Sequence, residues 1–591
     1  MAPSTPAELP SEPRQDIGAP SLNTNVEASS PAKAFNRGKR FWAIIATLAV
    51  IGLLSALENT VVTTALPFIA THLDLGDNFI WVTNAFFLAG AAVQPLFGQL
   101  ANIFGRRWVT LFIVACFTLG SGICGGANSA AMLIVGRTVQ GIGSGGINII
   151  IDIIISDLVP LRQRGNYIAI ILIVYSVGTT LGPWVGGVIV SNTSWRWVFY
   201  INLPVGGIAM VLIAAFLHVS YNKEMSFSQK LRRIDYGGNA ILIGSTVSVL
   251  YALTYGGGQL PWSSPQVISS LVIGIAGLGF FMWFETTRFV RDPVIPARLF
   301  ETRTASAIFA VTFLNSAVLY WVLFFLPIYF QAVLGSSPER AGVQLLPAIL
   351  VGIPGAVGAV LLLARFGRYK PLHLIGFGIQ TIGMGLFTLL NERSTTAHWV
   401  VYQSVAAFGS GFVLNTLLPA VQAQLDEVDQ AATTAAWSFM RSFGSIWGVA
   451  IPAAIFSNRF SIIAETDITD PAVRAIFVTG NDAYQRATAD FIRTFSPSDQ
   501  TQIIGVYSKS LQLVWQVSVA FSGLSFLIVF FEKQVKLRKK LDTEFGLESA
   551  KKGIKGPDIS RKDGIALVDD KKNTFTTSGG ESEAPGNTPG R

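Results

Sequence analysis

The stretch YSVGTTLGPWVGG, residues 175–187, places Gly178, Gly182, Gly186 and Gly187 in an apolar run that also contains Pro183. In a soluble helix each Gly costs about 1 kcal/mol and a Pro about 3 kcal/mol relative to Ala. In a bilayer, lipid supplies no hydrophobic drive for helices to associate, so small residues that allow close backbone contact are favoured. The stretch therefore predicts a membrane-spanning helix packed tightly against a neighbour.

The composition of the whole chain agrees with a membrane protein. Of 591 residues, 51% are hydrophobic and 13% are charged, and the mean hydropathy is +0.49. The net charge of +8 comes from short basic clusters between apolar runs, a pattern that sets membrane topology and does not indicate a nucleic-acid partner. Cys116 and Cys124 lie eight residues apart in one run and the four histidines are scattered, so we expect no disulfide, no metal site and no cofactor.

A bilayer core needs about 20 apolar residues per helix, and fourteen runs of that kind can be counted. They cover about 42–66, 79–98, 108–127, 131–151, 167–190, 197–219, 237–256, 266–286, 304–326, 341–363, 371–390, 398–420, 432–457 and 509–532. Lys and Arg concentrate in alternate loops, which predicts that both termini are cytoplasmic. The acidic loop QLDEVDQ, residues 424–430, does not fit this basic pattern.

Short segments recur at nearly one offset along the chain. ALPFI at 65–69 returns as FLPIY at 325–329, and FGRR at 104–107 returns as FGRY at 366–369, with offsets of 260 and 262 residues. GSG at 143–145 and the pair Gly178/Gly182 each return 266 residues later. Eight spans fit inside one offset, so the repeat predicts two parallel six-helix halves separated by two extra helices. The predicted divisions are a disordered tail (1–40), a first bundle (41–219), a linker with two spans (220–303), a second bundle (304–532) that includes an outer loop at 458–508, and a second disordered tail (533–591).

Several motifs resemble one known family. GQLANIFGRR (98–107) resembles the loop between the second and third helices of the major facilitator superfamily, and GRTVQGIGSGG (136–146) is similar to its fourth-helix motif. GTTLGPWVGG (178–187), WRWVFYINLPVGG (195–207) and LPIYFQAV (326–333) resemble segments of its 14-helix drug:proton antiporters, especially fungal toxin and multidrug exporters. The resemblance covers about 40–535. It implies an all-α integral membrane fold and alternating access driven by a proton gradient.

Two of these motifs are expected to act on conformation. The glycines of 178–187 predict a tight helix contact, with Pro183 bending the helix into a pivot or seal between the two halves. In the other motif we expect a tight cytoplasmic turn that carries two cations. Its residues are Gly98, Asn102, Gly105, Arg106 and Arg107. The family usually has an acidic residue where this chain has Asn102, which can cap a helix but forms no ion pair.

Charged groups within spans are expensive and mark function. Counting residues along oppositely directed helices puts Glu58 and Arg137 at similar depths below the outer surface, so we expect them to meet. The resemblance matches Arg137 to the fourth-helix Arg implicated in proton transfer. Arg441 lies at a comparable depth from the inner face. Asp152 is a second proton candidate, and Asp157 is expected in a loop. Polar candidates for a central cavity are Gln140, Asn148 and Gln331.

The sequence therefore predicts a monomeric, proton-driven exporter of small amphipathic compounds in the plasma membrane, with the vacuolar membrane as alternative. One alternative function is a carrier of cationic amino acids or iron chelates, and a receptor or channel is another. The sequence lacks the ATP-binding motif G-x-x-x-x-G-K-[ST], so we do not expect ATP to be the direct energy source. No motif in the sequence predicts an enzyme. Asn192, in the sequon NTS, is a glycosylation candidate in a very short outer loop.

Overall fold

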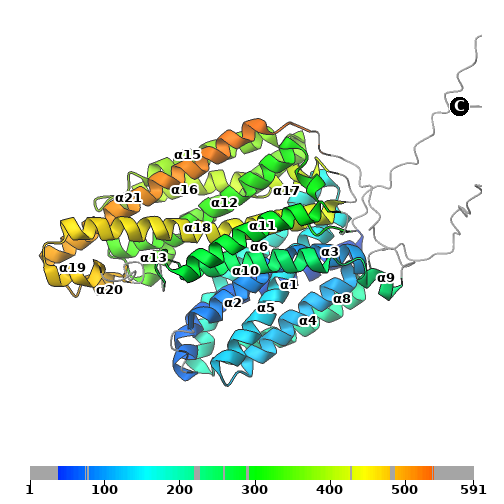
Figure 1. Cartoon of the computed structure of the whole chain (residues 1–591), viewed down its shortest axis with the longest axis horizontal. Coiled ribbons are helices and arrows are strands. Elements are labelled where there is room, and N and C mark those ends of the chain that lie inside the picture. The colour runs from blue at the N-terminus through cyan, green and yellow to red at the C-terminus, as the bar shows by residue number, and fades with distance from the viewer. Residues whose placement is uncertain are drawn as a thin grey trace, which may run out of the picture. The chain divides into compact units, whose positions relative to one another are not determined.

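Long helices run along a common direction through the computed structural model (Figure 1). The structure describes residues 38–73, 75, 79–218, 226–256, 260–287, 290, 292–425, 429–478, 486–535 and 537. The tails expected to be disordered lie almost wholly outside these residues. The described chain contains no β-strand, so the expected all-α class is confirmed.

The first half of the chain forms one bundle. A one-residue break at Val93 separates α2 from α3, and Ile201 separates the short α7 from α8. The helices are α1 (Lys39–His72), α2 (Phe79–Ala92), α3 (Gln94–Phe104), α4 (Arg106–Gly125), α5 (Ala130–Leu158), α6 (Leu161–Asn192), α7 (Trp197–Tyr200) and α8 (Asn202–Phe216). A buried apolar cluster that includes Phe97, Phe117 and Tyr167 fills the centre of this bundle.

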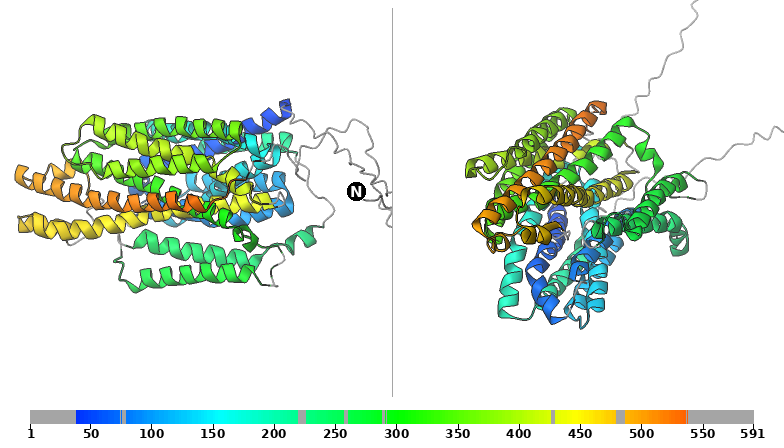
Figure 2. Two further views of the ribbon diagram at one scale, coloured as in Figure 1. Left: turned by 90° about the horizontal axis from the view of Figure 1, so that it is seen from above. Right: turned by 60° about the vertical axis from the view of Figure 1, so that its left-hand side comes forward.

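A linker with one short helix and two long antiparallel helices follows the first bundle. The linker contains α9 (Phe227–Leu231), α10 (Tyr236–Tyr255) and α11 (Pro265–Glu285). Figure 2 shows α10 and α11 side by side along the outside of the other helices. Large apolar side chains of α11 are exposed, among them Val272, Ile273 and Trp283. Such a surface is expected where a helix faces lipid.

The second half of the chain forms the other bundle. Its helices are α12 (Arg303–Ile328), α13 (Pro338–Gln344), α14 (Leu346–Phe366), α15 (Lys370–Phe387), α16 (Thr396–Leu414), α17 (Leu417–Gln422), α18 (Gln430–Asp467), α19 (Pro471–Val478), α20 (Ala489–Ile492) and α21 (Pro497–Ile528). A π-helical turn, η3 (Tyr329–Val333), ends α12, and two 3-10 turns are η2 (Ala297–Phe300) and η6 (Val529–Phe531).

Each of the fourteen expected spans overlaps helix. By length and composition, eleven helices of the described chain are able to cross a bilayer, and α2 with α3, bent by 46°, makes a twelfth. The remaining two expected spans fall on α6 and α15, which have 32 and 18 residues. The arrangement is consistent with fourteen spans.

Glycine contacts show that the sequence repeat is also a structural repeat. A Cβ on Gly178 of α6 would lie 3.1 Å from the Leu53 carbonyl oxygen of α1, and a Cβ on Gly444 of α18 would lie 2.3 Å from the Phe313 carbonyl oxygen of α12. Gly444 follows Gly178 by 266 residues and Phe313 follows Leu53 by 260. The next glycine of each helix repeats the contact, in the pairs Gly182 with Leu57 and Gly448 with Ala317. The α6–α1 contact of the first bundle is therefore repeated as α18–α12 in the second.

Candidate functional site

Glu58 of α1 and Arg137 of α5 form a buried ion pair. The Arg137 Nη1 to Glu58 Oε1 distance is 2.5 Å, and the two side chains are 2% and 0% exposed. Arg137 also donates to the Val82 carbonyl of α2 at 2.8 Å, and the Asn202 amide of α8 donates to Glu58 Oε2 at 2.6 Å. The structure thus brings together two residues that helix counting places at one depth, and it adds a partner from each of two further helices.

Gln140 belongs to the same network and does not line a cavity. Its side chain is fully buried, accepts from Arg137 at 2.7 Å and donates to the Ser121 hydroxyl at 2.7 Å. The ring of Phe86 lies 4.2 Å from the Arg137 guanidinium. The expectation that Gln140 is a polar contact in the central cavity is therefore wrong, because its hydrogen bonds hold the ion pair inside the first bundle.

A second charged cluster lies between the two bundles. Asp152 of α5 and Arg441 of α18 are close enough to interact electrostatically, although neither has a hydrogen bond or an ion pair within 4.0 Å from its side chain among the described residues. Arg441 also acts electrostatically on Tyr175 of α6 and Tyr320 of α12. Asp152 is 8% exposed and Tyr320 is 37% exposed. Sequence reasoning named Asp152 and Arg441 but missed the two tyrosines, because nothing in their local sequence distinguishes them from lipid-facing aromatic residues.

Asn148 and Gln331, the other two polar candidates for the central cavity, lie outside the hydrogen-bond network of Gln140. Asn148 lies one turn before Asp152 on α5, which puts both on one helix face, and it is half-buried without a hydrogen-bond partner among the described residues. Gln331 lies in the π-helical turn η3, half-buried and likewise without a described partner.

The FGRR turn joins α3 to α4 through Gly105, whose φ of 86° favours glycine. Arg106 was expected as a surface cation, but it is 3% exposed and its Nε lies 2.7 Å from the Asp157 carboxylate. Asp157 was expected in a loop, but it lies in the last turn of α5. Arg107 donates to the Ala214 carbonyl of α8 at 2.7 Å. The ion pair that Asn102 cannot make is thus formed by Asp157, from a helix that the local motif does not contain.

Gly98 and Asn102 also differ from expectation. Gly98 is not part of the turn; it lies within α3, where an added Cβ would come within 2.4 Å of the Ala435 Cβ of α18. It therefore marks close contact between the bundles. Asn102 lies in the last turn of α3, its Oδ1 is buried without a partner, and the N-terminus of α4 has no side-chain cap.

The glycines of 178–187 pack inside the first bundle. A Cβ on Gly182 would come within 1.9 Å of Thr60 Oγ1 of α1, whereas one on Gly187 would meet nothing within 4 Å. Gly186 is buried, and Pro183 lies within α6 with its side chain outside the described residues. The expectation of a seal between the two halves is therefore wrong for Gly178 and Gly182, since both face α1. The bend at Pro183 stays a prediction.

A hydrogen-bond network joins the bundles at the ends that carry the basic loops, which the Lys and Arg pattern predicts to be cytoplasmic. Arg164, in the first turn of α6, donates to the side-chain carbonyls of Gln422 and Gln430 at 2.7 and 2.8 Å. The Gln422 amide donates to the Ser156 hydroxyl of α5 at 2.9 Å. All four residues are less than 9% exposed. Arg164 is one of the Lys and Arg residues that concentrate in alternate loops, and no short motif in the sequence shows that α6 and α18 meet here.

The acidic loop 424–430 has a partner in the structure. Asp429 accepts two hydrogen bonds from Arg298, at 2.7 and 2.8 Å, and these bonds raise the pKa of Arg298 above its ordinary value. Arg298 lies in η2, in a segment that also contains Arg303. The acidic charge of Asp429 therefore compensates the positive charge of Arg298 in a neighbouring segment. Residues 426–428 lie outside the described chain.

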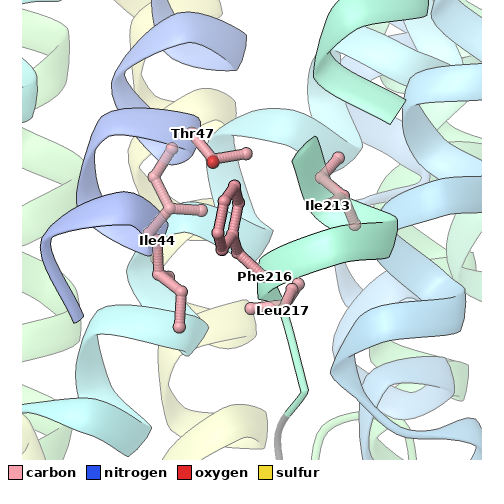
Figure 3. Close-up of a pocket in the computed structure, with 6 residues that line it drawn as sticks. Ile44, Thr47, Ile213, Phe216 and Leu217 are labelled. Carbon is pink, nitrogen blue, oxygen red and sulfur yellow. The ribbon is translucent and has the colours of Figure 1, made fainter. Parts of the chain in front are cut away.

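Among the described residues, no three His, Cys, Asp or Glu side chains come together so as to hold a metal ion. Asn192 is exposed, and its side-chain amide donates to the Val188 carbonyl at 2.8 Å. A small pocket between α1 and α8, lined by Ile44, Thr47, Ile213, Phe216, Leu217 and Leu48, carries no charged group and lies within one bundle (Figure 3).

Comparison with known sequences gives consistent matches. Residues 48–449 match the sequence model of the Major Facilitator Superfamily. The chain is 52% identical over 532 residues to the "MFS-type transporter TwmF" of Talaromyces wortmannii, covering 90% of this chain and 97% of the relative. It is 47% identical over 540 residues to the "MFS-type efflux transporter ffsH" of Aspergillus flavipes, with 91% and 92% covered. It is 42% identical over 534 residues to the "Efflux pump FUS6" of Gibberella fujikuroi, with 90% and 96% covered.

Solved structures match the fold at low identity. The proton:xylose symporter XylE aligns with a TM-score of 0.52 at 15% identity, covering 85% of this chain and 97% of that one. The human organic anion transporter MFSD10 aligns with a TM-score of 0.51 at 13% identity, covering 83% and 100%. These likenesses concern the arrangement of helices.

Proposed function

Because the chain belongs to the major facilitator superfamily, whose members carry small molecules across bilayers, we propose that it exports amphipathic organic compounds in exchange for protons. It is a multi-pass membrane transporter and not an enzyme. The names of its fungal relatives support the direction of transport. We also propose that it acts in the plasma membrane. We propose a monomer because both bundles needed for a pathway are present in one chain.

The observation that carries the proposal is the hydrogen-bonded closure between the bundles at Arg164. Alternating access requires the two bundles to separate at one end while they meet at the other. The Arg164 network, together with the Gly98–Ala435 contact, holds the cytoplasmic ends together in this structure. Breaking and remaking these bonds is the step that exposes the central site to the cytoplasm.

Proton coupling is assigned to Glu58. Its carboxylate is held by Arg137 and Asn202, so its charge is neutralised within the first bundle. A proton on Glu58 removes the attraction to Arg137, which keeps its bonds to Val82 and Gln140. The change leaves a buried cation without its counter-charge, a cost of several kcal/mol that is able to bias the two bundles toward another arrangement. Glu58 lies toward the outer side, where protons enter.

Asp152 is the second protonatable group. It lies between the bundles, 8% exposed, with Arg441 as its electrostatic partner across the interface. A proton on Asp152 changes an interaction between the bundles, whereas a proton on Glu58 changes one inside a single bundle. The two assignments are separated by experiment.

The test uses purified protein in liposomes with an imposed pH gradient, and the probes are cationic rhodamine 6G, neutral coumarin 6 and anionic carboxyfluorescein. We expect wild-type protein to move at least one probe against its gradient when the opposite side is acidic. Glu58→Gln is expected to abolish gradient-driven movement while probe exchange without a gradient persists. Glu465→Gln, an exposed acid on α18, is the control. If gradient-driven transport is normal in Glu58→Gln but lost in Asp152→Asn, proton coupling is assigned to Asp152. If it is normal in both variants, proton antiport through these two groups is refuted.

The alternative carrier of cationic amino acids or iron chelates gains no support from the interface. A site for cations needs an excess of acidic groups. The charged cluster between the two bundles instead pairs one acid, Asp152, with one cation, Arg441. A receptor or channel is excluded by the family.

A further inference from the structure

We propose that Arg441, Tyr175 and Tyr320 bind the acidic oxygen group of an organic anion, such as a carboxylate or a phenolate, whose apolar body lies on the neighbouring aromatic side chains. This inference names the substrate class of the exporter and rests on the transport function proposed above.

The main support for the inference is that the N–H groups of the Arg441 guanidinium donate no hydrogen bond to any described residue. A guanidinium has five N–H donors, and a charge inside a span is tolerated only with partners or in a polar cavity. Arg441 is half-buried in α18 and makes no hydrogen bond or ion pair with any described residue; its side chain lies over the Trp437 ring at 4.7 Å. Arg137 and Arg164, by contrast, are 2% and 3% exposed, and the N–H groups of each donate hydrogen bonds to several acceptors.

Two tyrosines add donors beside this cation. Tyr175 accepts a hydrogen bond from the Asn59 amide at 2.7 Å, which leaves the Tyr175 O–H able to donate. Tyr320 is 37% exposed and has no hydrogen-bond partner among the described residues. Both lie near enough to Arg441 to interact electrostatically. An arrangement of N–H and O–H donors is complementary to oxygen acceptors, and a charge-assisted bond to an anion is the strongest that it can form.

The apolar part of the proposed ligand also has a surface. Phe324 lies one turn beyond Tyr320 on α12, with the two rings stacked at 6.3 Å and Phe324 41% exposed. Trp437 is 4% exposed, so it packs against the Arg441 guanidinium at 4.7 Å and leaves the aromatic surface for the ligand to Tyr320 and Phe324. Charge and exposed aromatic surface side by side suit an amphipathic acid better than a small inorganic anion.

Asp152 sets the affinity of this site. It is the counter-charge of Arg441 across the interface, but no ion pair within 4.0 Å joins them. An anion that binds Arg441 therefore meets repulsion from an ionised Asp152. Neutralising Asp152 is expected to tighten anion binding, which is the opposite of what removing Arg441 does.

The experiment is equilibrium binding of radiolabelled 2-naphthoate to the full chain in nanodiscs without a pH gradient, with unlabelled 2-naphthamide as the neutral competitor. We expect wild-type protein to bind the acid with an affinity about tenfold or more above that of the amide, since one charge-assisted bond is at stake. Arg441→Gln is expected to lose that preference, Arg441→Lys to keep part of it, and Asp152→Asn to increase it. Arg459→Gln, an exposed Arg on the same helix, is the matched control and is expected to leave binding unchanged.

Equal affinity for acid and amide, absence of acid binding to wild-type protein, or an unchanged preference in both Arg441 variants would overturn the inference. Arg441→Lys serves if Arg441→Gln does not fold. Because no gradient is applied, acid-selective binding without proton-driven transport refutes only the proposed coupling. Export of anionic carboxyfluorescein that is the same in Arg441→Gln and wild type refutes only the anion site.

Discussion

Gln430 follows Arg164 by 266 residues and accepts a hydrogen bond from its guanidinium at 2.8 Å. Ser156 and Gln422 are also 266 residues apart and hydrogen-bonded, at 2.9 Å. This is the offset at which Gly178 recurs as Gly444, so each pair consists of equivalent positions in the two bundles. Two equivalent positions touch only where the axis relating the bundles passes between them. The closure between the bundles is therefore centred on that axis, where separation of the bundles breaks all these bonds together.

Arg164→Ala is expected to open the cytoplasmic end, because it leaves buried glutamine carbonyls unpaired at about 1–3 kcal/mol each. The measurement is the rate at which an impermeant maleimide labels Ala435→Cys from the cytoplasmic side, in a background without Cys116 and Cys124. We expect a rise of about tenfold or more. Arg368→Ala, an exposed cytoplasmic Arg, is the control, and equal labelling in the two variants would remove Arg164 from the closure.

Gly98→Leu is expected to have the same conformational effect by a steric route. Its Cβ would lie 2.4 Å from Ala435 Cβ, so α3 and α18 are unable to approach as they do here. Transport should fall to background while the protein reaches the membrane. Gly358→Leu, on α14 with nothing within 4 Å, should transport normally. Wild-type rates in Gly98→Leu would show that the close approach is dispensable.

Gly182→Leu is expected to destabilise the first bundle. A Cβ at this position meets Thr60 Oγ1 at 1.9 Å, and overpacking of this kind costs about 1–3 kcal/mol or more. The matched variant is Gly187→Leu. Gly187 lies about one and a half turns further along α6, and a Cβ added there would meet no atom within 4 Å. Thermal unfolding in detergent should show a lower midpoint for the first variant only. Equal midpoints would contradict the tight contact of α6 with α1.

Removing one member of the Glu58–Arg137 pair is expected to cost about 3–5 kcal/mol of stability, because a buried charge then lacks its counter-charge. Replacing both, as Glu58→Gln with Arg137→Gln, should be less destabilising than the sum of the single changes. A double-mutant cycle on thermal unfolding measures the difference. Strict additivity would mean that the pair does not interact in the folded protein.

The broad architecture was predictable because a bilayer imposes strong local rules. Each span must be helical and of similar length, so the apolar runs located helices such as α5 and α12 without knowledge of their neighbours. The pairing of Glu58 with Arg137 was also within reach, since depth along a straight helix follows from residue counting.

Other parts of the site were beyond local patterns. Asp157 was expected in a loop, yet it is the partner of Arg106, and the acidic loop that had no explanation neutralises Arg298 through Asp429. Tyr175 and Tyr320 gave no signal at all, because an aromatic residue in a span has the same local sequence whether it faces lipid or a second bundle. The motif that contains Gly98 ends in a turn, so its local sequence predicts a turn residue where the structure has an inter-bundle contact within α3.

The sequence by itself determined the membrane class, the helical spans and the twofold repeat, since hydrophobicity, chain length and self-similarity are properties of the chain that need no partner. Only the tertiary structure decided which faces meet: that Gly182 packs on α1 within one bundle, and that Arg164 closes on Gln430 from the other. The physical reason is that such contacts join residues far apart in the chain, 266 positions for Arg164 and Gln430, and their geometry depends on the rotation of each helix about its axis, which hydropathy does not fix.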